Sequence, residues 1–188
     1  MIGYRLNNLK KYLDDLAAKL PAPGGGSAAA LTGSLGASLI SMVINFSIGK
    51  PGYARYEKFL NATLKKSEKL RKRLLDLVDL DVRAYKSKDL KESLAIPLEV
   101  ARLCLEGIKL CPELIKKGNI NLISDVGVAA VFLEAAFTSA VFNVDINLKY
   151  LKDKKLSKTL RKELNKKERL IKKIRLQTEE KVNEIIRR

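Results

Sequence analysis

The sequence contains no histidine and no tryptophan, and it has only two cysteines among 188 residues. Without histidine the chain can form neither a Ser-His-Asp triad nor a Cys-His pair, and zinc sites that need histidine ligands are excluded as well. Any acid–base chemistry must therefore use Asp, Glu, Lys, Tyr or Cys side chains.

The few cysteines and the N-terminal segment point to a cytoplasmic protein. Cys104 and Cys111 are seven residues apart, which fits one face of a helix and not a CxxC motif, so we interpret them as reduced core residues. Segment 1–19 has charges throughout and does not resemble a secretory signal. Segment 20–49 is uncharged and long enough to span a bilayer, but its prolines, glycines and serines favour a buried helix over a membrane span.

Basic residues outnumber acidic ones by 37 to 21, which gives a formal net charge of +16. More than half of this excess lies in segment 152–188, which has 15 Lys or Arg and six Asp or Glu. A basic surface attracts polyanions, and a helical bundle that binds nucleic acid is therefore one alternative. Lysines spread around helices, without interleaved aromatic residues, favour a solvated surface and no nucleic-acid partner.

Apolar periodicity predicts a chain of helices. Leucines at spacings of three and four predict an amphipathic helix over 4–19. Similar patterns predict helices over 27–48, 54–86, 97–117, 122–150 and 157–186. We expect Pro97 in the first turn of its helix and a bend at Pro112. The helix over 122–150 is apolar on nearly every side, which is typical of a central helix. The sequence therefore predicts an all-α fold, a single domain over 1–188 with about six helices in a bundle.

The most unusual stretch is Pro21–Ser27, with the sequence PAPGGGS. Its three glycines precede Ser27, which can cap the following helix, and they leave bare N–H groups at a helix N-terminus. That geometry suits a carboxylate, a phosphate or a flat ring lying on the backbone. The pattern is neither GxGxxG nor a P-loop, so it does not indicate a nucleotide. A tight turn between packed helices is the alternative.

Asp81 falls on the inner stripe of the helix over 54–86, after Leu74 and Leu77. An unpaired carboxylate in that position would have a raised pKa, which suits general acid–base catalysis. A carboxylate satisfied by a lysine or by a helix end is the alternative.

Four further polar residues are candidates with ordinary explanations. Asp125 follows Ser124 at the start of a helix, where N-capping accounts for the pair. Asn143 and Asn147 are four apart and share a face of that helix, where they could bind neighbouring groups or a heterocycle. Lys50 lies in a loop between Gly and Pro, where it could meet an anionic ligand or be an ordinary surface lysine.

In order along the chain, these segments resemble the cyclodeaminase/cyclohydrolase family. That family includes the cyclodeaminase domain of formiminotransferase-cyclodeaminase and stand-alone methenyltetrahydrofolate cyclohydrolases. The resemblance covers residues 5–153, and the basic C-terminal helix over 154–188 lies outside it. The matching motifs are Pro21–Ala30 followed by Gly49-Lys50, Asp79–Asp81, Ile96–Ala101, Gly118-Asn119 with Ser124–Ala129, and Asn143–Lys149.

The resemblance implies a helical homodimer, a tetrahydrofolate derivative as substrate, and neither a metal ion nor a permanently bound cofactor. It also implies one of two reactions. A cyclohydrolase opens 5,10-methenyltetrahydrofolate to 10-formyltetrahydrofolate by adding water to the methenyl carbon. A cyclodeaminase closes 5-formiminotetrahydrofolate to the methenyl form and releases ammonia. Both reactions pass through a tetrahedral carbon between two ring nitrogens.

On the matching positions, the resemblance implies Asp81 as the proton-transfer group, Asp125 as a second carboxylate near the ring, and Lys50 as a contact for an anionic part of folate. It implies substrate binding by Pro23, Gly24, Gly25, Gly26, Ser27, Asn143 and Asn147.

We predict carboxylate-assisted cyclohydrolase activity, because the sequence has no formiminotransferase domain to supply a deaminase. Cyclodeaminase activity is the first alternative. A non-catalytic protein that binds folate or a partner is the second, because segment 82–96 is shorter than in many relatives. The basic segment after residue 151 could attract the polyglutamate tail of folate.

Overall fold

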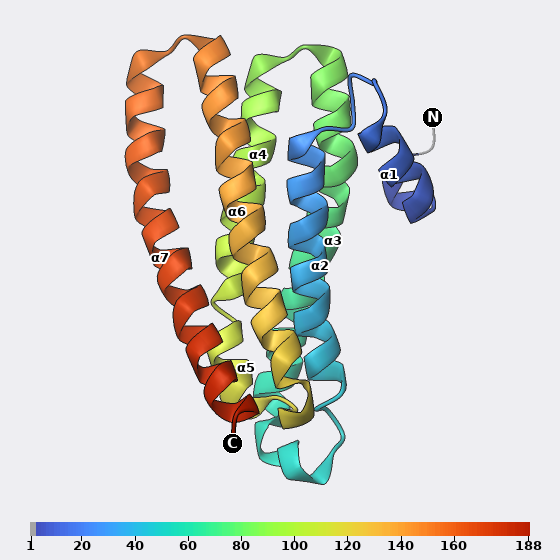
Figure 1. The fold of residues 1–188 in the computed structure, drawn as a ribbon, viewed down its shortest axis with the longest axis vertical. Coiled ribbons are helices and arrows are strands. Elements are labelled where there is room, and N and C mark those ends of the chain that lie inside the picture. Colours follow the sequence, from blue (N-terminus) through green and yellow to red (C-terminus); the bar gives the residue numbers. More distant parts are fainter. Residues whose placement is uncertain (1–2) are drawn as a thin grey trace.

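The computed structural model describes residues 3–188, which form helices and no strand (Figure 1). The α-helices are α1 (Leu9–Ala17), α2 (Gly25–Asn45), α3 (Glu57–Ser87), α4 (Leu90–Ile108), α5 (Cys111–Lys117), α6 (Ile123–Leu151) and α7 (Lys154–Ile186). Short 3₁₀ segments are η1 (Tyr4–Leu6), η2 (Pro51–Tyr56) and η3 (Ile120–Leu122). The predicted all-α class is confirmed.

The long helices run alternately up and down the bundle (Figure 1). The N-terminus of α2 and the C-termini of α3 and α6 meet at one end, which is the upper end in Figure 1. The C-terminus of α2 and the N-termini of α3 and α6 meet at the lower end. Residues that begin and end the same helix are therefore separated by the length of the bundle.

Two predicted details around the prolines are wrong. The helix expected over 97–117 is divided between α4 and α5. α4 begins at Leu90 after an Asp89 cap, so Pro97 lies inside the helix instead of in its first turn. Pro112 lies in the first turn of α5 instead of bending one longer helix, because its ring is compatible with a helix start. The division gives seven α-helices within residues 3–188, where about six were expected.

Buried serines at intervals of seven hold α2 against α3. Ser27 and Ser34 donate hydrogen bonds to main-chain carbonyl groups of α3. Ser41 shares a hydrogen bond of 2.9 Å with the buried hydroxyl of Ser67. Because each buried hydroxyl needs a partner, the three bonds favour one register between the helices.

Small residues let the neighbours of α2 approach closely. A Cβ on Gly33 would stand 2.9 Å from the sulfur of Cys104 on α4, and a Cβ on Gly36 would stand 2.8 Å from Leu133 on α6. Cys104 and Cys111 are buried and unpaired, and burial raises the pKa of both thiols. The two cysteines are thus packing residues, although they belong to different helices.

Two apolar surfaces predicted to be buried are exposed instead. α1 is amphipathic, but the leucines that we expected on its buried side are exposed to solvent. Leu9 and Leu13 are two of them. α6 packs against α2, α4 and α7 as a central helix should. It nevertheless leaves Val131 and Phe142 exposed, and Phe142 has 70% of its surface accessible. The apolar sequence of α6 therefore reflects more than packing within one chain.

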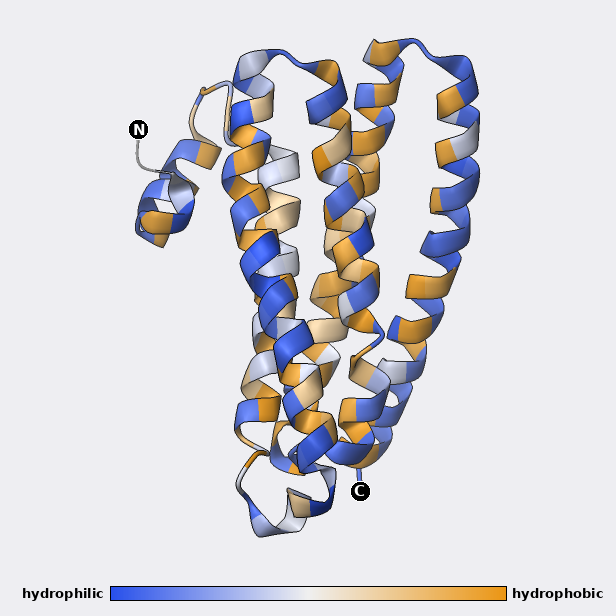
Figure 2. Ribbon diagram, turned by 180° about the vertical axis from the view of Figure 1, so that it is seen from behind, coloured by the Kyte–Doolittle hydropathy of each residue, from blue (hydrophilic) through white to orange (hydrophobic). Residues whose placement is uncertain are grey.

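Residues Gly25–Asn45 and Ile120–Leu151 are long and apolar enough to cross a membrane, judged by length and composition alone. The core helix of a water-soluble protein passes the same test. α2 lies between α3 and α6, and most of its apolar window is buried. Figure 2 shows hydrophilic residues along most of α7 and on the outer side of α3.

Candidate active site

A small pocket of about 280 Å³ lies at the upper end of the bundle, between the N-terminus of α2 and the last turns of α3 and α6. Its predicted lining residues are Gly24, Gly25, Gly26, Asp81, Asn143 and Asn147. Pro21 and Ala22, from the unusual PAPGGGS stretch, line it as well. Lining residues that the sequence did not single out are Tyr85, Ser93, Ile146 and Tyr150. The pocket thus combines a glycine-rich backbone, one carboxylate, two amides and two tyrosines.

The Asp81 carboxylate lies directly against the first turn of α2. It accepts a hydrogen bond from the main-chain N–H of Ser27. α2 begins at Gly25 without a side-chain cap of its own, so Asp81 serves as the acceptor at this helix terminus. The predicted capping by Ser27 is wrong. A Cβ on Gly26 would stand 2.8 Å from Asp81 Cγ and closer still to Oδ1, so only glycine leaves room for the carboxylate.

Burial raises the pKa of Asp81 to about 6, although the hydrogen bond from Ser27 partly counteracts the shift. No Lys or Arg within residues 3–188 lines this pocket. Of the two alternative partners considered for Asp81, the structure shows the helix end, which is the N-terminus of α2, and no lysine in the pocket lining. A carboxyl group with a pKa near 6 can accept and return a proton close to neutral pH, as an acid–base catalyst must.

The side chain of Ser27 points away from the pocket. It is fully buried, donates to the carbonyl of Val78 at 3.1 Å and accepts from the hydroxyl of Tyr12 at 3.2 Å. Ser27 therefore acts on the site through its N–H group rather than its hydroxyl. Pro23 is likewise buried and does not line the pocket.

Asn147 donates a hydrogen bond to a main-chain carbonyl group of α4 that has no partner within its own helix. Pro97 has no N–H, so the carbonyl of Ser93, four residues earlier in α4, loses its helical partner. The Asn147 Nδ2 group donates to this carbonyl at 2.7 Å. The bond joins α6 to α4 at the pocket wall and fixes the orientation of the Asn147 amide.

We expect Asn147→Ala to lower the free energy of unfolding by about 1–3 kcal/mol, because the Ser93 carbonyl loses its partner. In a Pro97→Ala background the new N–H can bond Ser93, and the same substitution should cost less. Urea unfolding of the four proteins in this double-mutant cycle measures the difference. Equal costs in both backgrounds would contradict the assignment.

Asn143 borders the glycine segment. Its Nδ2 donates to the carbonyl of Ser139 at 2.9 Å within α6. A Cβ on Gly25 would stand 3.6 Å from this nitrogen and 3.8 Å from Oδ1 of the same amide. The amide therefore forms the α6 side of the entrance to the glycine backbone.

Lys50 and Asp125 do not join this pocket within one chain. Lys50 follows the C-terminus of α2, and Asp125 lies in the first turn of α6, so both lie at the lower end. The length of α2, about 30 Å, separates them from Asp81. Lys50 Nζ lies 5.9 Å from the ring centre of Phe46. Neither charge forms an ion pair with any residue in the described range 3–188.

Asp79, two residues before Asp81, binds the N-terminal segment and not the pocket. Its carboxylate is buried and accepts the N–H of Tyr4 at 2.6 Å, with Arg5 Nε 3.7 Å away. Asp79 therefore anchors the N-terminal segment to α3 and does not face the pocket.

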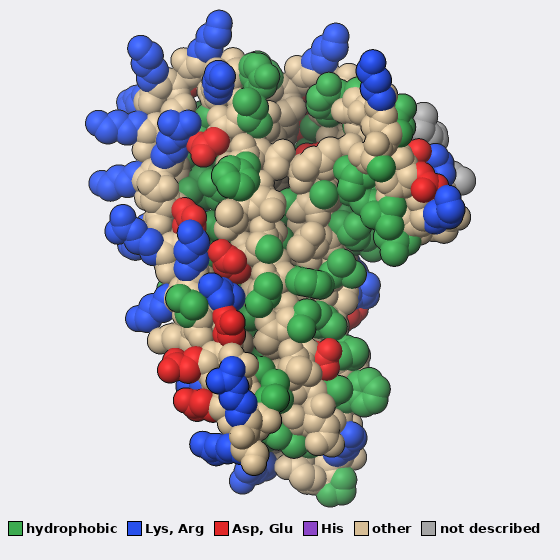
Figure 3. All heavy atoms as spheres, in the orientation of Figure 1, with side chains coloured by type: hydrophobic (Ala, Val, Ile, Leu, Met, Phe, Trp, Pro, Cys, Tyr) green, Lys and Arg blue, Asp and Glu red, His purple; other side chains and the backbone are tan. Residues whose placement is uncertain are grey.

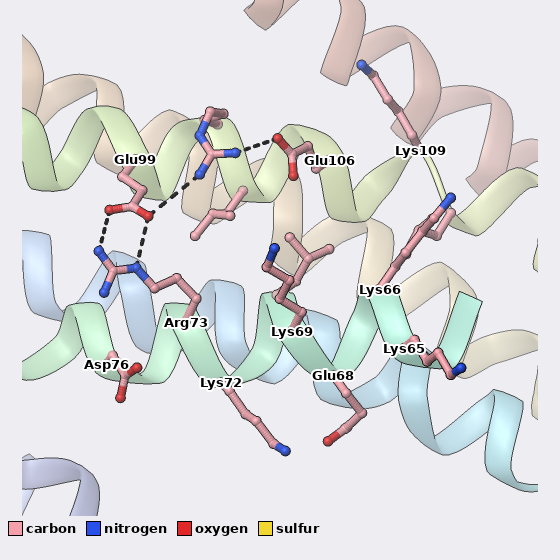
Figure 4. Close-up of a pocket in the computed structure, with 14 residues that line it drawn as sticks. Lys65, Lys66, Glu68, Lys69, Lys72, Arg73, Asp76, Glu99, Glu106 and Lys109 are labelled. Carbon is pink, nitrogen blue, oxygen red and sulfur yellow. Dashed lines mark hydrogen bonds and ion pairs between the residues drawn. The ribbon is translucent and has the colours of Figure 1, made fainter. Parts of the chain in front are cut away.

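A larger open groove of about 1160 Å³ runs between α3 and α4 (Figure 4). Arg73 holds Glu99 through two hydrogen bonds of 2.9 and 2.7 Å, and Arg102 bonds Glu106 at 2.6 Å. Lys65 and other lysines extend outward from the groove, as Figure 4 shows. The carboxylates that line this groove are all paired with arginines, so the groove offers no unpaired carboxylate comparable to Asp81.

Within residues 3–188, no three Asp, Glu or Cys side chains are grouped so that they could hold a metal ion. The Asp81 pocket offers one carboxylate, amides and backbone groups. Such a set suits a polar heterocycle better than a cation.

Known proteins resemble nearly the whole chain. A family model described as formiminotransferase-cyclodeaminase matches residues 8–88 and 86–166. The methenyltetrahydrofolate cyclohydrolase of Methylorubrum extorquens is 38% identical over 179 residues, which cover 83% of this chain and 86% of that protein. The formimidoyltransferase-cyclodeaminase of Rattus norvegicus is 30% identical over 169 residues, which cover 78% of this chain and 31% of the rat protein.

A solved structure has the same architecture. The crystal structure of formiminotetrahydrofolate cyclodeaminase from Thermotoga maritima matches with a TM-score of 0.82 and 28% sequence identity. The match covers 97% of this chain and 96% of that one. Proteins named for two related folate reactions therefore resemble this chain.

Proposed function

Because the chain belongs to the formiminotransferase-cyclodeaminase family, we propose that it is a methenyltetrahydrofolate cyclohydrolase. Its substrates are 5,10-methenyltetrahydrofolate and water, and its product is 10-formyltetrahydrofolate. The observation that carries this proposal is the 38% identity to a cyclohydrolase over most of both chains. The Asp81 pocket supports it with an acid–base group of suitable pKa.

Asp81 acts twice in the proposed mechanism. Its ionised form takes a proton from water as the water oxygen attacks the carbon between N5 and N10 of the substrate. The tetrahedral adduct then breaks its bond to N5, which receives a proton, and the oxygen stays on the carbon as the formyl group. One water proton thus ends on N5 and the other in solvent. A carboxyl group with a pKa near 6 suits both transfers.

The remaining pocket residues bind the flat ring in this proposal. Gly24 and Gly25 allow the ring to approach the backbone at the start of α2. Asn143 and Asn147 supply amide groups to ring donors and acceptors. Tyr85 and Tyr150, at 59% and 60% exposure, provide aromatic surface at the pocket mouth.

Turnover should depend on the ionised form of Asp81. Burial raises the pKa of this carboxyl from its ordinary 3.8 to about 6, so the base is available above pH 6 and is lost by protonation below it. We expect kcat/KM to fall about tenfold per pH unit once the pH is well below 6. A pH–rate profile between pH 4.5 and 8 checks this. A flat profile across pH 6 would exclude Asp81 as the base.

The first experiment is an ultraviolet assay of the purified protein with 5,10-methenyltetrahydrofolate. Loss of the methenyl absorbance faster than the spontaneous hydrolysis supports cyclohydrolase activity. If the loss is not accelerated, the same protein is tested with 5-formiminotetrahydrofolate, because relatives named for cyclodeaminase activity favour that alternative. Inactivity with both, together with folate binding, would favour a non-catalytic folate-binding protein.

We also propose that the protein is a cytoplasmic homodimer that accepts folate, including polyglutamylated folate. The exposed apolar surfaces of α2 and α6 support the dimer. Light scattering after size-exclusion chromatography measures the oligomeric state, and a monomer would contradict this part of the proposal.

A further inference from the structure

α1 buries a tyrosine and leaves its leucines exposed. This short helix lies beside the upper end of α2 and α3, outside the long helices of the bundle (Figure 1). Tyr12 is the buried residue of α1 and has 4% of its surface accessible, whereas Leu9 and Leu13 are 63% and 50% exposed. A helix that packs on its own chain to bury apolar surface would turn its leucines inward. The contacts of the Tyr12 hydroxyl group therefore need an explanation.

Two hydrogen bonds lead from Tyr12 to the Asp81 carboxylate through a single residue. The Tyr12 hydroxyl donates to Oγ of Ser27 at 3.2 Å, and the Ser27 hydroxyl donates to the carbonyl of Val78 at 3.1 Å. The main-chain N–H of the same serine donates to Asp81. Because its buried hydroxyl is bound from both α1 and α3, Ser27 has little freedom to move, and the direction of its N–H is fixed with it.

α1 is in turn attached to α3 beside Asp81. The main-chain N–H of Tyr4 donates to Asp79 at 2.6 Å, and the Tyr4 hydroxyl donates to Asp15 of α1 at 2.9 Å. The rings of Tyr4 and Tyr12 meet edge to face, with their centres 5.3 Å apart. The N-terminal segment therefore places the Tyr12 hydroxyl through contacts that do not involve the pocket itself.

The outer surface of α1 carries charges of both signs. Figure 3 shows acidic and basic side chains close together at the outer edge of this segment. Two ion pairs between residues four apart support the short helix, and they join Lys10 to Asp14 and Lys11 to Asp15. The helical form of α1 thus has local support, and the side of the helix toward Ser27 is left to the tyrosine.

Few titratable groups surround Asp81. Within residues 3–188, no other Asp or Glu and no Lys or Arg lines its pocket, and the remaining titratable groups of the lining are Tyr85 of α3 and Tyr150 of α6. Tyr12 lies behind Ser27. Burial raises the pKa of Tyr12 and the negative charge of Asp81 adds to the increase, although the bond to Ser27 opposes it. The Tyr12 hydroxyl therefore stays protonated at neutral pH and remains a donor.

We infer that Tyr12 is a positioning residue, whose hydroxyl fixes Ser27 so that the Ser27 N–H holds the Asp81 carboxylate in the orientation that accepts a proton. The role of Asp81 as the base rests on the proposed function. The hydrogen bonds from Tyr12 through Ser27 to Asp81 do not depend on it.

Tyr12→Phe removes the hydroxyl and keeps the buried ring. We expect kcat to fall about 3–10-fold, which is the effect of one neutral hydrogen bond. KM should stay within about twofold of wild type, because Tyr12 does not line the pocket. A weaker bond from Ser27 favours the ionised carboxylate less, so the midpoint of the acid side of the pH–rate profile should rise by about half a pH unit. A wild-type kcat and midpoint would overturn the inference.

Tyr4→Phe is the matched control. It removes a hydroxyl from the same segment, but that hydroxyl bonds Asp15 and not Ser27. Loss of this bond should lower the melting temperature and leave kcat and the pH midpoint as in wild type. If both variants lost kcat equally and neither midpoint moved, the attachment of α1 alone would matter, and the inference would be overturned.

Ser27→Ala tests the route between the two residues. This variant keeps the N–H that bonds Asp81 and removes the hydroxyl that bonds Tyr12. Adding Tyr12→Phe to Ser27→Ala should therefore cause no further rise of the pH midpoint. The same rise in both backgrounds would show that Tyr12 acts by another path, which contradicts the inference.

A titration without substrate separates this inference from the proposed function. In protein labelled with ¹³C at the aspartate carboxyl groups, the Asp81 signal is identified by its loss in Asp81→Asn and followed by nuclear magnetic resonance between pH 3 and 8. Its midpoint should be higher in Tyr12→Phe than in wild type. An unchanged midpoint would overturn the positioning role even in an active enzyme. A raised midpoint in a protein that turns over neither folate would show that the proposed function is wrong while the positioning stands.

Discussion

Replacing Asp81 with asparagine should lower kcat by at least about 100-fold. The amide keeps the shape of the carboxylate and can still accept the N–H of Ser27, but it cannot take a proton from water. The side chain remains against Gly26, so the pocket keeps its form. The decline in methenyl absorbance measures turnover, and far-ultraviolet circular dichroism checks that the helices remain.

The same substitution should raise stability above pH 6. The raised pKa means that the unfolded chain ionises Asp81 from about pH 4, whereas the folded chain does so only near pH 6. Stability from this group is therefore highest at low pH and is lost as the pH rises through this window. Asparagine has no charge to desolvate, so the melting temperature of Asp81→Asn should exceed that of wild type at pH 8 and match it near pH 4.

Asp76→Asn is the matched control. Asp76 lies on the same helix and is exposed, where it pairs with Arg5. This variant should keep wild-type turnover and lack the pH-dependent gain in stability. Wild-type turnover in Asp81→Asn would eliminate the proposed mechanism, whereas equal losses in both variants would indicate a general effect of charge on α3.

Local patterns were sufficient to predict most of the fold. The inner stripe of α3 with Leu74 and Leu77 is buried as expected. The boundaries that failed depend on partners distant in sequence. Pro97 is tolerated inside α4 because Asn147, fifty residues later, bonds the carbonyl that the proline leaves free. Periodicity within one helix contains no information about such a partner.

The site was only partly predictable, because sequence patterns single out unusual residues but not the distant residues that they contact. Gly26 and Asp81 could be singled out, since a glycine before a helix and a carboxylate on an apolar stripe are both unusual. That Asp81 excludes a side chain at Gly26 depends on the register of α2 against α3. Lys50 was grouped with Asp81 through the family resemblance, yet within one chain the two residues lie at opposite ends of the helical bundle.

Gly26→Ala should reduce kcat by about 100-fold, because misplacing a catalytic group by about 1 Å has effects of that size. The new methyl group would stand 2.8 Å from Asp81 Cγ and closer to Oδ1, so the carboxylate must move. Alanine favours a helix more than glycine does, and the bundle should therefore remain folded. The displaced carboxylate should also be better hydrated, which would shift the acid side of the pH–rate profile below pH 6.

Gly24→Ala is the matched control for this prediction. A Cβ on Gly24 meets nothing within 4 Å, and its φ of −138° suits any residue. Because Gly24 lines the pocket, we expect the added methyl group to weaken ring binding and raise KM. At saturating substrate, kcat should stay within about twofold of wild type and its pH dependence should be unchanged, because nothing displaces Asp81. If Gly26→Ala is as active as Gly24→Ala, the position of the Asp81 carboxylate does not limit turnover, and proton transfer must be assigned to another group. If both variants lose kcat equally, the glycines matter for the approach of the ring to the backbone instead.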